Sequence, residues 1–431
     1  MKLAIIGAGW AGLAAAVQAT HDGHRVTVFE SARTLGGRAR TVPGQLPDGR
    51  TVPLDNGQHI LIGAYTETLR LMRTVGIDPE AVLHRQPLCL QFPDGSGLRL
   101  PRLPAPWDAF IGILRTRTWP LSARLGLLRT ARQWQSARFQ CPPALTVAQL
   151  CQHLAPCVRE ALIDPLCVSA LNTPAPQASA QVFLRVLQDA LFSVPGGSHL
   201  LLPRCDLSAL FPVAAAAWLQ QHGATVHMGH RITTLQTDGM RWHVQDQPFD
   251  AVLLACSAAE AVHLLHTVSQ CSSDLAPSLQ TWCAHAQTLA YEAITTVYGW
   301  HPQARLSAPM LALRHAASAP AQFIFDRGQL GGPSGLLALV ISASGSEREQ
   351  LQDLALAQAQ TQFGWPLQAV LTVVEKRATF ACTPGLQRPP ITITPTLLAC
   401  GDYVAGPYPA TLEGAVRSGL QAVANLPQTD R

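Results

Sequence analysis

Residues 3–30 of the chain read LAIIGAGWAGLAAAVQATHDGHRVTVFE. The wholly apolar run Leu3–Ile6 is typical of a parallel strand that is covered on both faces. The alanine-rich stretch Leu13–Thr20 predicts a helix, and Arg25–Phe29 predicts a second strand that closes on the acid Glu30. This order of strand, helix, strand and acid predicts a βαβ unit of the kind that binds dinucleotides.

The loop between the first strand and the helix fits the pattern G-x-G-x-x-G. Gly7 permits the tight turn, Gly9 lets the backbone approach a pyrophosphate, and Gly12 lets the helix pack closely on the strand. The helix N-terminus offers unpaired backbone amides to the phosphates, and a carboxylate 18 residues after Gly12 is placed to accept hydrogen bonds from a ribose. In this unit, the residues expected to bind the dinucleotide are Gly7, Gly9, Trp10, Ala11, Gly12 and Glu30.

A second glycine-arginine element follows directly, with residues 31–41 reading SARTLGGRART. It resembles the corresponding element of FAD enzymes in the amine oxidase and phytoene desaturase superfamily. The resemblance implies that Gly36 and Gly37 allow close passage of the backbone and that Arg38 faces the pyrophosphate of FAD. Ser31 and Arg33 belong to the same cofactor-binding stretch.

A third element lies near the C-terminus, where a short apolar strand ends in Gly401-Asp402 and is followed by residues 411–419, TLEGAVRSG. It resembles the closing motif of the same superfamily, in which the aspartate binds the ribityl or pyrophosphate part of FAD. The helix after it, entered through Thr411 and Leu412, would point its positive end at the flavin pyrimidine, where negative charge grows on reduction.

Three further stretches, 223–227, 231–235 and 249–256, are predicted to add strands to the same domain. The resemblance implies that the backbone near Ile232 contacts adenine. We therefore expect an α/β fold, with a Rossmann-like FAD-binding domain of the amine oxidase/glutathione reductase type and an inserted α+β substrate domain. The FAD-binding domain is expected to comprise residues 1–80, 201–261 and 391–431, and the substrate domain residues 81–200 and 262–390.

Composition narrows the class of protein further. Only 13% of the 431 residues are charged, against about 25% in average globular proteins. The apolar fraction of 48% and the net charge of +4 exclude a disordered chain and a nucleic-acid partner. Eleven cysteines without a C-x-x-C pair fit thiols in a reducing compartment, so we expect a cytoplasmic location. The H-x-x-H pairs lack a third ligand, so no metal site is expected.

Residues 99–138 have an unusual charge pattern, with eight arginines against one acid, Asp108. Arginine interleaved with tryptophan and leucine suits contact with anionic lipid. On a helical wheel, however, Arg132 falls between Leu125 and Leu128, so the polar and apolar faces do not separate. Two interpretations stay open, namely peripheral contact with the inner face of the cell membrane and a solvated basic surface.

The most specific stretch is Leu54–Tyr65, which reads LDNGQHILIGAY. Together with Asp164–Thr173 and Gly401–Gly419 it resembles the squalene-associated FAD-dependent enzymes of hopanoid-producing bacteria, the hydroxysqualene dehydroxylases. The resemblance implies reduction of hydroxysqualene to squalene with release of water. It also implies that four residues lie at the cofactor, namely Asn56, Gly57, Gln58 and His59.

Loss of a hydroxyl group as water requires a proton donor, for which His59, Asp55, Asp164 and Tyr403 are the candidates. An imidazolium titrates in the right range, and an aspartic acid in an apolar pocket can stay protonated. Asp55 and His59 have an alternative role as hydrogen-bonding partners of the flavin or of their own loop.

Two other functions stay open. Cofactor motifs do not distinguish a dehydroxylase from an FAD-dependent desaturase or oxidase of the carotenoid type, since flavin serves both directions. A non-catalytic flavoprotein that carries squalene-like lipids is the second alternative. Only one G-x-G-x-x-G is present, so there is no dedicated NAD(P)H unit and the flavin needs an external reductant, for which NAD(P)H is a candidate.

Overall fold

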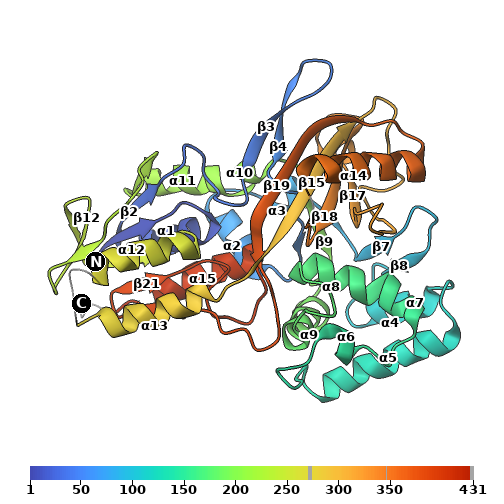
Figure 1. Ribbon diagram of the computed structural model, residues 1–431, viewed down its shortest axis with the longest axis horizontal. Coiled ribbons are helices and arrows are strands. Elements are labelled where there is room, and N and C mark those ends of the chain that lie inside the picture. Colours follow the sequence, from blue (N-terminus) through green and yellow to red (C-terminus); the bar gives the residue numbers. More distant parts are fainter. Residues whose placement is uncertain (270–273, 346, 428–431) are drawn as a thin grey trace.

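A computed structural model describes residues 1–269, 274–345 and 347–427 of the chain. Its central element is a six-stranded sheet in the order β10-β2-β1-β14-β21-β20, in which β20 alone is antiparallel to its neighbour. The six strands span Thr225–Met228, Arg25–Glu30, Lys2–Ile6, Ala251–Leu254, Leu397–Ala399 and Thr392–Thr394. The sheet therefore brings together segments that lie far apart in the sequence (Figure 1).

Strand β1 is covered on both of its faces. Leu3 and Ile5 belong to the core formed with helix α1 (Trp10–His21), α11 (Pro212–Gln221) and α15 (Leu412–Ala424). Ala4 and Ile6 belong to the opposite core, which includes α12 (Ala258–Ser269) and α13 (Ala276–Gln287). This confirms the strand that the continuous apolar run predicts.

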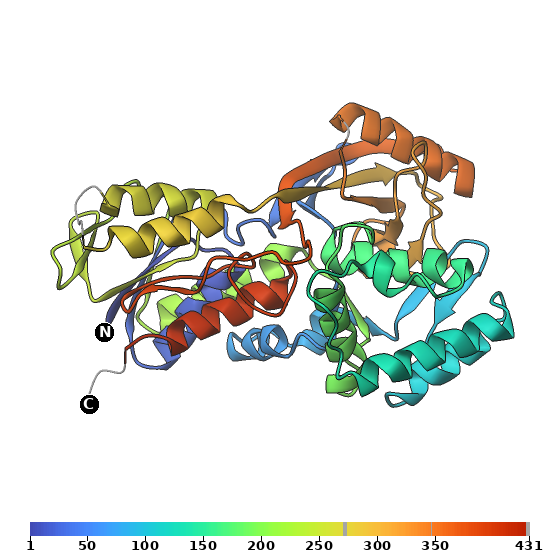
Figure 2. The ribbon, with the colours of Figure 1, turned by 60° about the horizontal axis from the view of Figure 1, so that its bottom comes forward.

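A second, antiparallel sheet has the strand order β16-β17-β18-β15-β19. Its strands span Met310–Ala312, Phe323–Asp326, Leu336–Ser342, Tyr291–Trp300 and Gln368–Phe380. Helix α14 (Arg348–Phe363) covers one face, where Leu351 packs with Leu337 and Leu339 in a separate core. The sheet and this helix form the upper part of the second lobe (Figure 2).

The lower part of that lobe is mainly helical (Figure 2). Its helices are α4 (Trp107–Arg115), α5 (Leu121–Ser136), α6 (Val147–Leu150), α7 (Pro156–Val158), α8 (Asp164–Leu171) and α9 (Ala180–Gln188). Two single π-turns, Arg159–Ile163 and Asp189–Ser193, precede α8 and follow α9. No helix within the described ranges has the length and apolar content needed to cross a bilayer.

The remaining elements of the chain are short. Two small sheets have two strands each, β3 (Thr41–Gln45) with β4 (Thr51–Asp55) and β7 (Cys89–Gln91) with β8 (Gly97–Arg99). Two others have three strands each, in the orders β5 (Leu61–Ile62), β9 (Leu200–Pro203), β6 (Leu83–Gln86) and β11 (Gln236–Thr237), β12 (Trp242–Val244), β13 (Gln247–Phe249). The short helices are α2 (Thr66–Thr74), α3 (Pro79–Val82) and α10 (Leu207–Leu210), and η3 (Arg327–Leu330) is a 3-10 turn.

Two expectations from the sequence are wrong. Residues 231–235 form no strand, because no neighbouring strand pairs with them and Leu235 N instead donates to Thr267 Oγ1 of α12 at 3.1 Å. The domain boundary at 262 also places α13 in the substrate domain. Instead α13 packs on the FAD sheet beside β20, with Trp282 Nε1 donating to the carbonyl of Pro390 at 2.8 Å.

Candidate functional site

The glycine loop between β1 and α1 is shaped by close backbone packing. Gly7 has a φ of +117°, and a Cβ there would lie 2.6 Å from the carbonyl oxygen of Ala255. A Cβ at Gly12 would lie 2.0 Å from the carbonyl oxygen of Gly7. These two positions therefore accept no side chain, which agrees with the turn and packing roles expected for them.

Gly9 is different, because a Cβ there would meet only the Cα of Gly37, at 3.8 Å. Gly9 is the N-cap of α1 and supplies no side chain to the free amides of the first helical turn. Uncapped amides at a helix N-terminus attract an anion. The open space beside Gly9 therefore fits the pyrophosphate of FAD, which Gly9 is expected to admit.

Glu30 closes this loop against the end of β2. Its carboxylate accepts hydrogen bonds from Ala8 N at 2.7 Å and Ala32 N at 2.8 Å, and the residue is only 8% exposed. A pocket of about 40 Å³ lies beside it. The pocket is lined by Ile6, Gly7, Phe29, Ser31, His230, Arg231, Ile232, Cys256 and Glu260. It thus brings together Gly7, Ser31 and Ile232, as expected for an adenosine site.

The second glycine element lies against the first. Gly36 N donates to the carbonyl of Ala8 at 3.0 Å. Trp10 takes part differently from the expectation, since its indole Nε1 donates to the carbonyl of Ala39 at 3.1 Å and its ring packs 5.1 Å from that of Phe211. Only the backbone of Trp10 is thus placed at the helix N-terminus.

For two other predicted cofactor residues, no contact among the described residues supports the role. Ala11 is buried in the same helix, and its carbonyl would lie 2.3 Å from a Cβ at Gly419. Arg33 is exposed and forms no hydrogen bond within the described ranges.

Arg38 and Asp402 form an ion pair, although 364 residues separate them. Arg38 Nη1 also donates to the carbonyl of Ala378 at 2.7 Å, at the end of β19. Arg388, which the sequence reasoning missed, donates from Nη1 to the carbonyl of Asp402 at 3.2 Å. The two residues assigned to FAD by resemblance therefore meet, and a bound phosphate would share Arg38 with Asp402.

Asn56 holds the backbone that carries Arg38. Its Nδ2 donates to the carbonyl of Arg38 at 2.8 Å, and its Oδ1 accepts from Arg40 N at 3.0 Å. Gln58 faces the second lobe, since its N donates to Thr296 Oγ1 of β15 at 3.4 Å and its Oε1 accepts from Arg327 Nη1 at 3.4 Å. This segment thus connects the cofactor loops with the second sheet.

His59 lies at the end of that segment, and its Nδ1 pairs with the carbonyl of Gly57 at 2.7 Å. A carbonyl partner requires that Nδ1 carry the proton, which leaves Nε2 as an acceptor in the neutral ring. Burial, and to a smaller extent the Arg38 guanidinium, lower the pKa of His59 against the opposing effect of the Gly57 bond. The lowered pKa therefore disfavours the imidazolium form that the proton-donor role of His59 requires.

Asp55 is buried, with 2% exposure, at the end of β4. Its Oδ1 accepts a hydrogen bond from Leu207 N at 2.8 Å, while its backbone carbonyl accepts from Tyr298 Oη at 2.9 Å. Burial raises the pKa of Asp55 to about 6, although Leu207 N and Arg327 act in the opposite direction. Of the two roles left open by the sequence, these contacts favour anchoring of the loop.

The raised pKa predicts a pH-dependent effect of Asp55→Asn. Folding raises the pKa from 3.8 to about 6, so the native state binds more protons than the unfolded state in this window and stability falls as pH rises through it. The amide keeps an acceptor for Leu207 N and never ionises. We expect the variant to be about as stable as the wild type at pH 4 and roughly 3 kcal/mol more stable than the wild type at pH 8, measured by urea unfolding. A variant destabilised equally at both pH values would contradict the account.

Asp164 and Tyr403 belong to other segments of the chain than Asp55 and His59. Asp164 begins α8 directly after a π-turn, burial raises its pKa, and no hydrogen bond in the described part of the chain joins it to His59. Tyr403 is 3% exposed and packs edge-on to Trp282 at 6.4 Å. Its hydroxyl has no hydrogen-bond partner among the described residues. A buried hydroxyl of this kind fits a site that a bound group completes.

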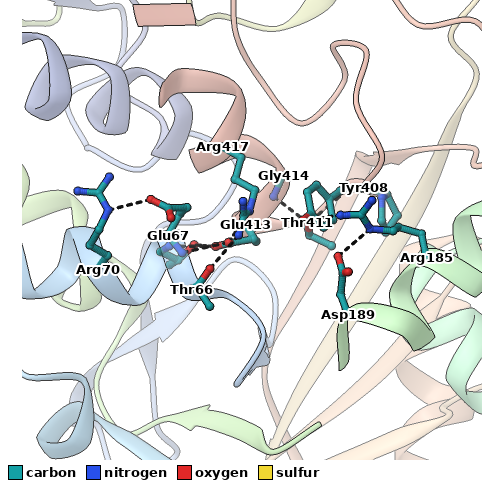
Figure 3. Close-up of polar contacts among 12 residues, drawn as sticks. Thr66, Glu67, Arg70, Arg185, Asp189, Tyr408, Thr411, Glu413, Gly414 and Arg417 are labelled. Atoms are coloured by element: carbon teal, nitrogen blue, oxygen red, sulfur yellow. Dashed lines mark hydrogen bonds and ion pairs between the residues drawn. The ribbon is translucent and has the colours of Figure 1, made fainter. Parts of the chain in front are cut away.

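The closing helix α15 begins as the resemblance implies. Thr411 is its N-cap and accepts from Gly414 N at 3.0 Å, and Leu412 is its first residue. The sequence patterns did not identify a role for Glu413, although it lies within the closing motif, residues 411–419. It is 1% exposed, and its carboxylate accepts from Thr68 N at 2.9 Å, from Thr68 Oγ1 at 2.6 Å and from Arg417 Nε at 2.7 Å (Figure 3).

Tyr408 contacts the helical part of the second lobe. Its ring lies between the guanidinium groups of Arg185 and Arg417, each 5.4 Å from the ring centroid (Figure 3). Arg185 comes from α9 and is held by Asp189 at 2.9 Å. The helical part of the second lobe therefore contacts the closing motif directly.

Comparison with known proteins agrees with this geometry. The family model of the flavin containing amine oxidoreductases matches residues 10–427. The hydroxysqualene dehydroxylase of Sinorhizobium fredii is 26% identical over 97% of this chain and 96% of its own length. The hydroxysqualene dehydroxylase of Zymomonas mobilis is also 26% identical, over 97% of each chain.

Two more distant likenesses bear on the fold and on the alternatives. The zeta-carotene desaturase of Capsicum annuum is 38% identical over 78 residues, which are 18% of this chain and 13% of that protein. An oxidoreductase from Methanosarcina mazei superposes with a TM-score of 0.72 at 16% identity, covering 98% of this chain and 100% of its own. The α/β FAD-binding fold with an additional domain is thereby confirmed.

Proposed function

Because this chain belongs to the family of flavin-containing amine oxidoreductases, and is thus an FAD-dependent oxidoreductase, we propose that it reduces hydroxysqualene to squalene with loss of water. The observation that supports the choice is the likeness to hydroxysqualene dehydroxylases along 97% of the chain. The LDNGQHILIGAY segment, which connects the cofactor loops with the second sheet, lies within that likeness. The proposal places the enzyme in the supply of squalene for hopanoids.

The residues present fit an FAD molecule. The glycine loop and the N-terminus of α1 would hold its pyrophosphate, and the residues around the small pocket at Ile232 would contact its adenine. Asn56 would keep Arg38 in place, while α15 would present its N-terminus to the flavin ring. When reduced, the bound FAD supplies a hydride, so the C–O bond of the allylic alcohol is replaced by C–H.

The departing hydroxyl takes up one proton to leave as water. Burial raises the pKa of both Asp164 and Tyr403, which favours their protonated forms, whereas His59 is favoured neutral and Asp55 is bonded to Leu207. We therefore retain Asp164 and Tyr403 as candidate donors. Asp164→Asn and Tyr403→Phe distinguish them, because loss of the true donor lowers the rate about 100-fold or more at unchanged FAD content.

The proposed reaction can be tested by anaerobic reoxidation. The holoenzyme is reduced with dithionite and mixed with hydroxysqualene, and the return of the oxidised flavin absorbance is followed. We expect reoxidation at a rate that depends on hydroxysqualene concentration, with squalene itself as the inactive control. The alternative is a carotenoid-type desaturase, which the local likeness to zeta-carotene desaturase supports. Such an enzyme would leave the flavin reduced in this experiment. Its oxidised flavin would instead become reduced when squalene is added.

The reductant of the flavin belongs to the same proposal. The sequence holds one G-x-G-x-x-G loop, and the proposal assigns that loop to FAD. An external donor, with NAD(P)H as the candidate, would therefore deliver electrons without a Rossmann unit of its own in this chain.

A further inference from the structure

The large apolar side chains exposed at the surface are concentrated in one short segment. In the part of the chain that the structure describes, five of the seven come from residues 103–125. They are Leu103, Trp107, Phe110, Leu121 and Leu125, with exposed fractions of 38%, 60%, 42%, 58% and 52%. Single exposed apolar residues are common, whereas a contiguous group marks an interaction surface. We call this group, with the exposed arginines beside it, the α4–α5 face.

Helix α5 presents both kinds of side chain on one side. Leu121, Leu125 and Arg129 follow one another at intervals of four residues and are exposed, and Arg132 follows as the next turn of the same face. Leu128 is instead partly buried against the core, and Leu127 is 4% exposed. The conflict on the helical wheel disappears, because Leu128 does not belong to the outer face.

The α4–α5 face is positively charged, and its arginines have no ion-pair partners among the described residues. Its exposed arginines are Arg102, Arg115, Arg117, Arg129 and Arg132. None of them forms an ion pair within the described ranges, whereas exposed arginines elsewhere do, such as Arg50 with Asp48 and Arg314 with Asp94. The one acid of the segment, Asp108, is 3% exposed and faces inward, where Ser198 Oγ lies 3.4 Å from its carboxylate. The outer face therefore carries no carboxylate to neutralise the arginines.

Helices α4 and α5 pack together, and Arg124 Nη1 of α5 donates to the carbonyl of Leu114 in α4 at 2.6 Å. Trp107 and Phe110 project from α4 with their rings edge-on, 6.1 Å apart. In both ribbon views α5 lies at the outer edge of the second lobe, far from the sheet that holds the glycine loop (Figures 1 and 2). Docking at this edge would leave the FAD domain free.

We propose that the α4–α5 face docks the protein on a membrane surface that contains anionic phospholipid. Trp107, Leu121 and Leu125 would enter the headgroup region, and the arginines would pair with lipid phosphates. Charge complementarity favours an anionic membrane over a second copy of this chain, because two copies of the face would bring arginine against arginine. The surface would bring the enzyme to where a water-insoluble isoprenoid is dissolved, but the binding itself does not depend on the proposed reaction.

Flotation of the purified holoprotein with vesicles tests the proposal. Wild type is expected to bind vesicles of phosphatidylcholine with 30% phosphatidylglycerol and to bind pure phosphatidylcholine at least about tenfold more weakly. Leu121→Gln with Leu125→Gln should lower binding to the anionic vesicles about tenfold or more. Val213→Gln with Met240→Gln, which alters exposed apolar residues outside the face, is the matched control and should bind as wild type.

A second pair of variants isolates the charge. Arg129→Gln with Arg132→Gln should lower binding to anionic vesicles about tenfold, whereas Arg305→Gln with Arg348→Gln, two exposed arginines elsewhere, should not. All four variants alter exposed positions, so wild-type melting temperatures are expected. Wild type that fails to float with anionic vesicles, or face variants that float like their controls, would overturn the proposal. So would a dimer in solution that the face variants dissociate.

Discussion

Glu413→Ala is expected to lower the free energy of unfolding by about 3–5 kcal/mol, because removing one partner leaves buried polar groups without theirs. The carboxylate is 1% exposed and accepts hydrogen bonds from Glu67 N, Thr68 N and Thr68 Oγ1 at the start of α2, as well as from Arg417. An acid at a helix N-terminus is also favoured by the helix dipole. Its loss would thus detach α2 from the first turn of α15.

Urea unfolding followed by circular dichroism measures this effect. The matched control is Glu67→Ala, which removes a carboxylate that pairs with Arg70 on the surface of the same helix. Exposed pairs contribute about 0–1 kcal/mol, so the control should stay close to wild type. Equal stabilities of the two variants would show that Glu413 does not anchor the closing helix.

Gly9→Ala is expected to abolish most FAD binding while leaving the fold intact. The φ of Gly9 is −75°, which alanine adopts readily, and its Cβ would meet no protein atom nearer than 3.8 Å. Stability should therefore change by less than about 1 kcal/mol. The same Cβ would occupy the space assigned to the pyrophosphate, so we expect the dissociation constant of FAD to rise about thirtyfold or more, the equivalent of about 2 kcal/mol.

Gly12→Ala gives the opposite pattern and is the comparison variant. Its Cβ would lie 2.0 Å from the carbonyl oxygen of Gly7, so α1 must move away from β1, at an expected loss of about 3 kcal/mol or more. FAD content after purification and urea unfolding of the apoprotein separate the two effects. Gly9→Ala protein purified with full flavin would show that the phosphates lie elsewhere.

The first lobe was predictable because its signals are local. The apolar run Leu3–Ile6 needs only its own composition to mark a doubly covered strand, and the glycines act through their own backbone. Residues 231–235 show the limit of such signals. Ile232 and Leu235 are buried, but a strand requires a paired neighbour, and the pairing partner of this segment is a helix side chain, Thr267.

The roles of His59, Asp55 and Glu413 depend on the folded surroundings of each residue. The pKa of His59 depends on burial and on Arg38, and the role of Asp55 depends on Leu207, 152 residues away. The partners of Glu413 in α2 lie 345 and 346 residues from it in sequence. Contacts at such separations leave no trace in local patterning, so these roles could be read only from the folded chain.

Product analysis after a single anaerobic turnover tests the proposed reaction most directly. Reduced holoenzyme is incubated with hydroxysqualene, and the extract is analysed by mass spectrometry. The account predicts squalene, formed in an amount equal to the reduced flavin consumed, and none with Gly9→Ala protein that lacks FAD. Recovery of unchanged hydroxysqualene with the flavin still reduced would contradict it, as would a more unsaturated polyene formed from squalene by the oxidised enzyme.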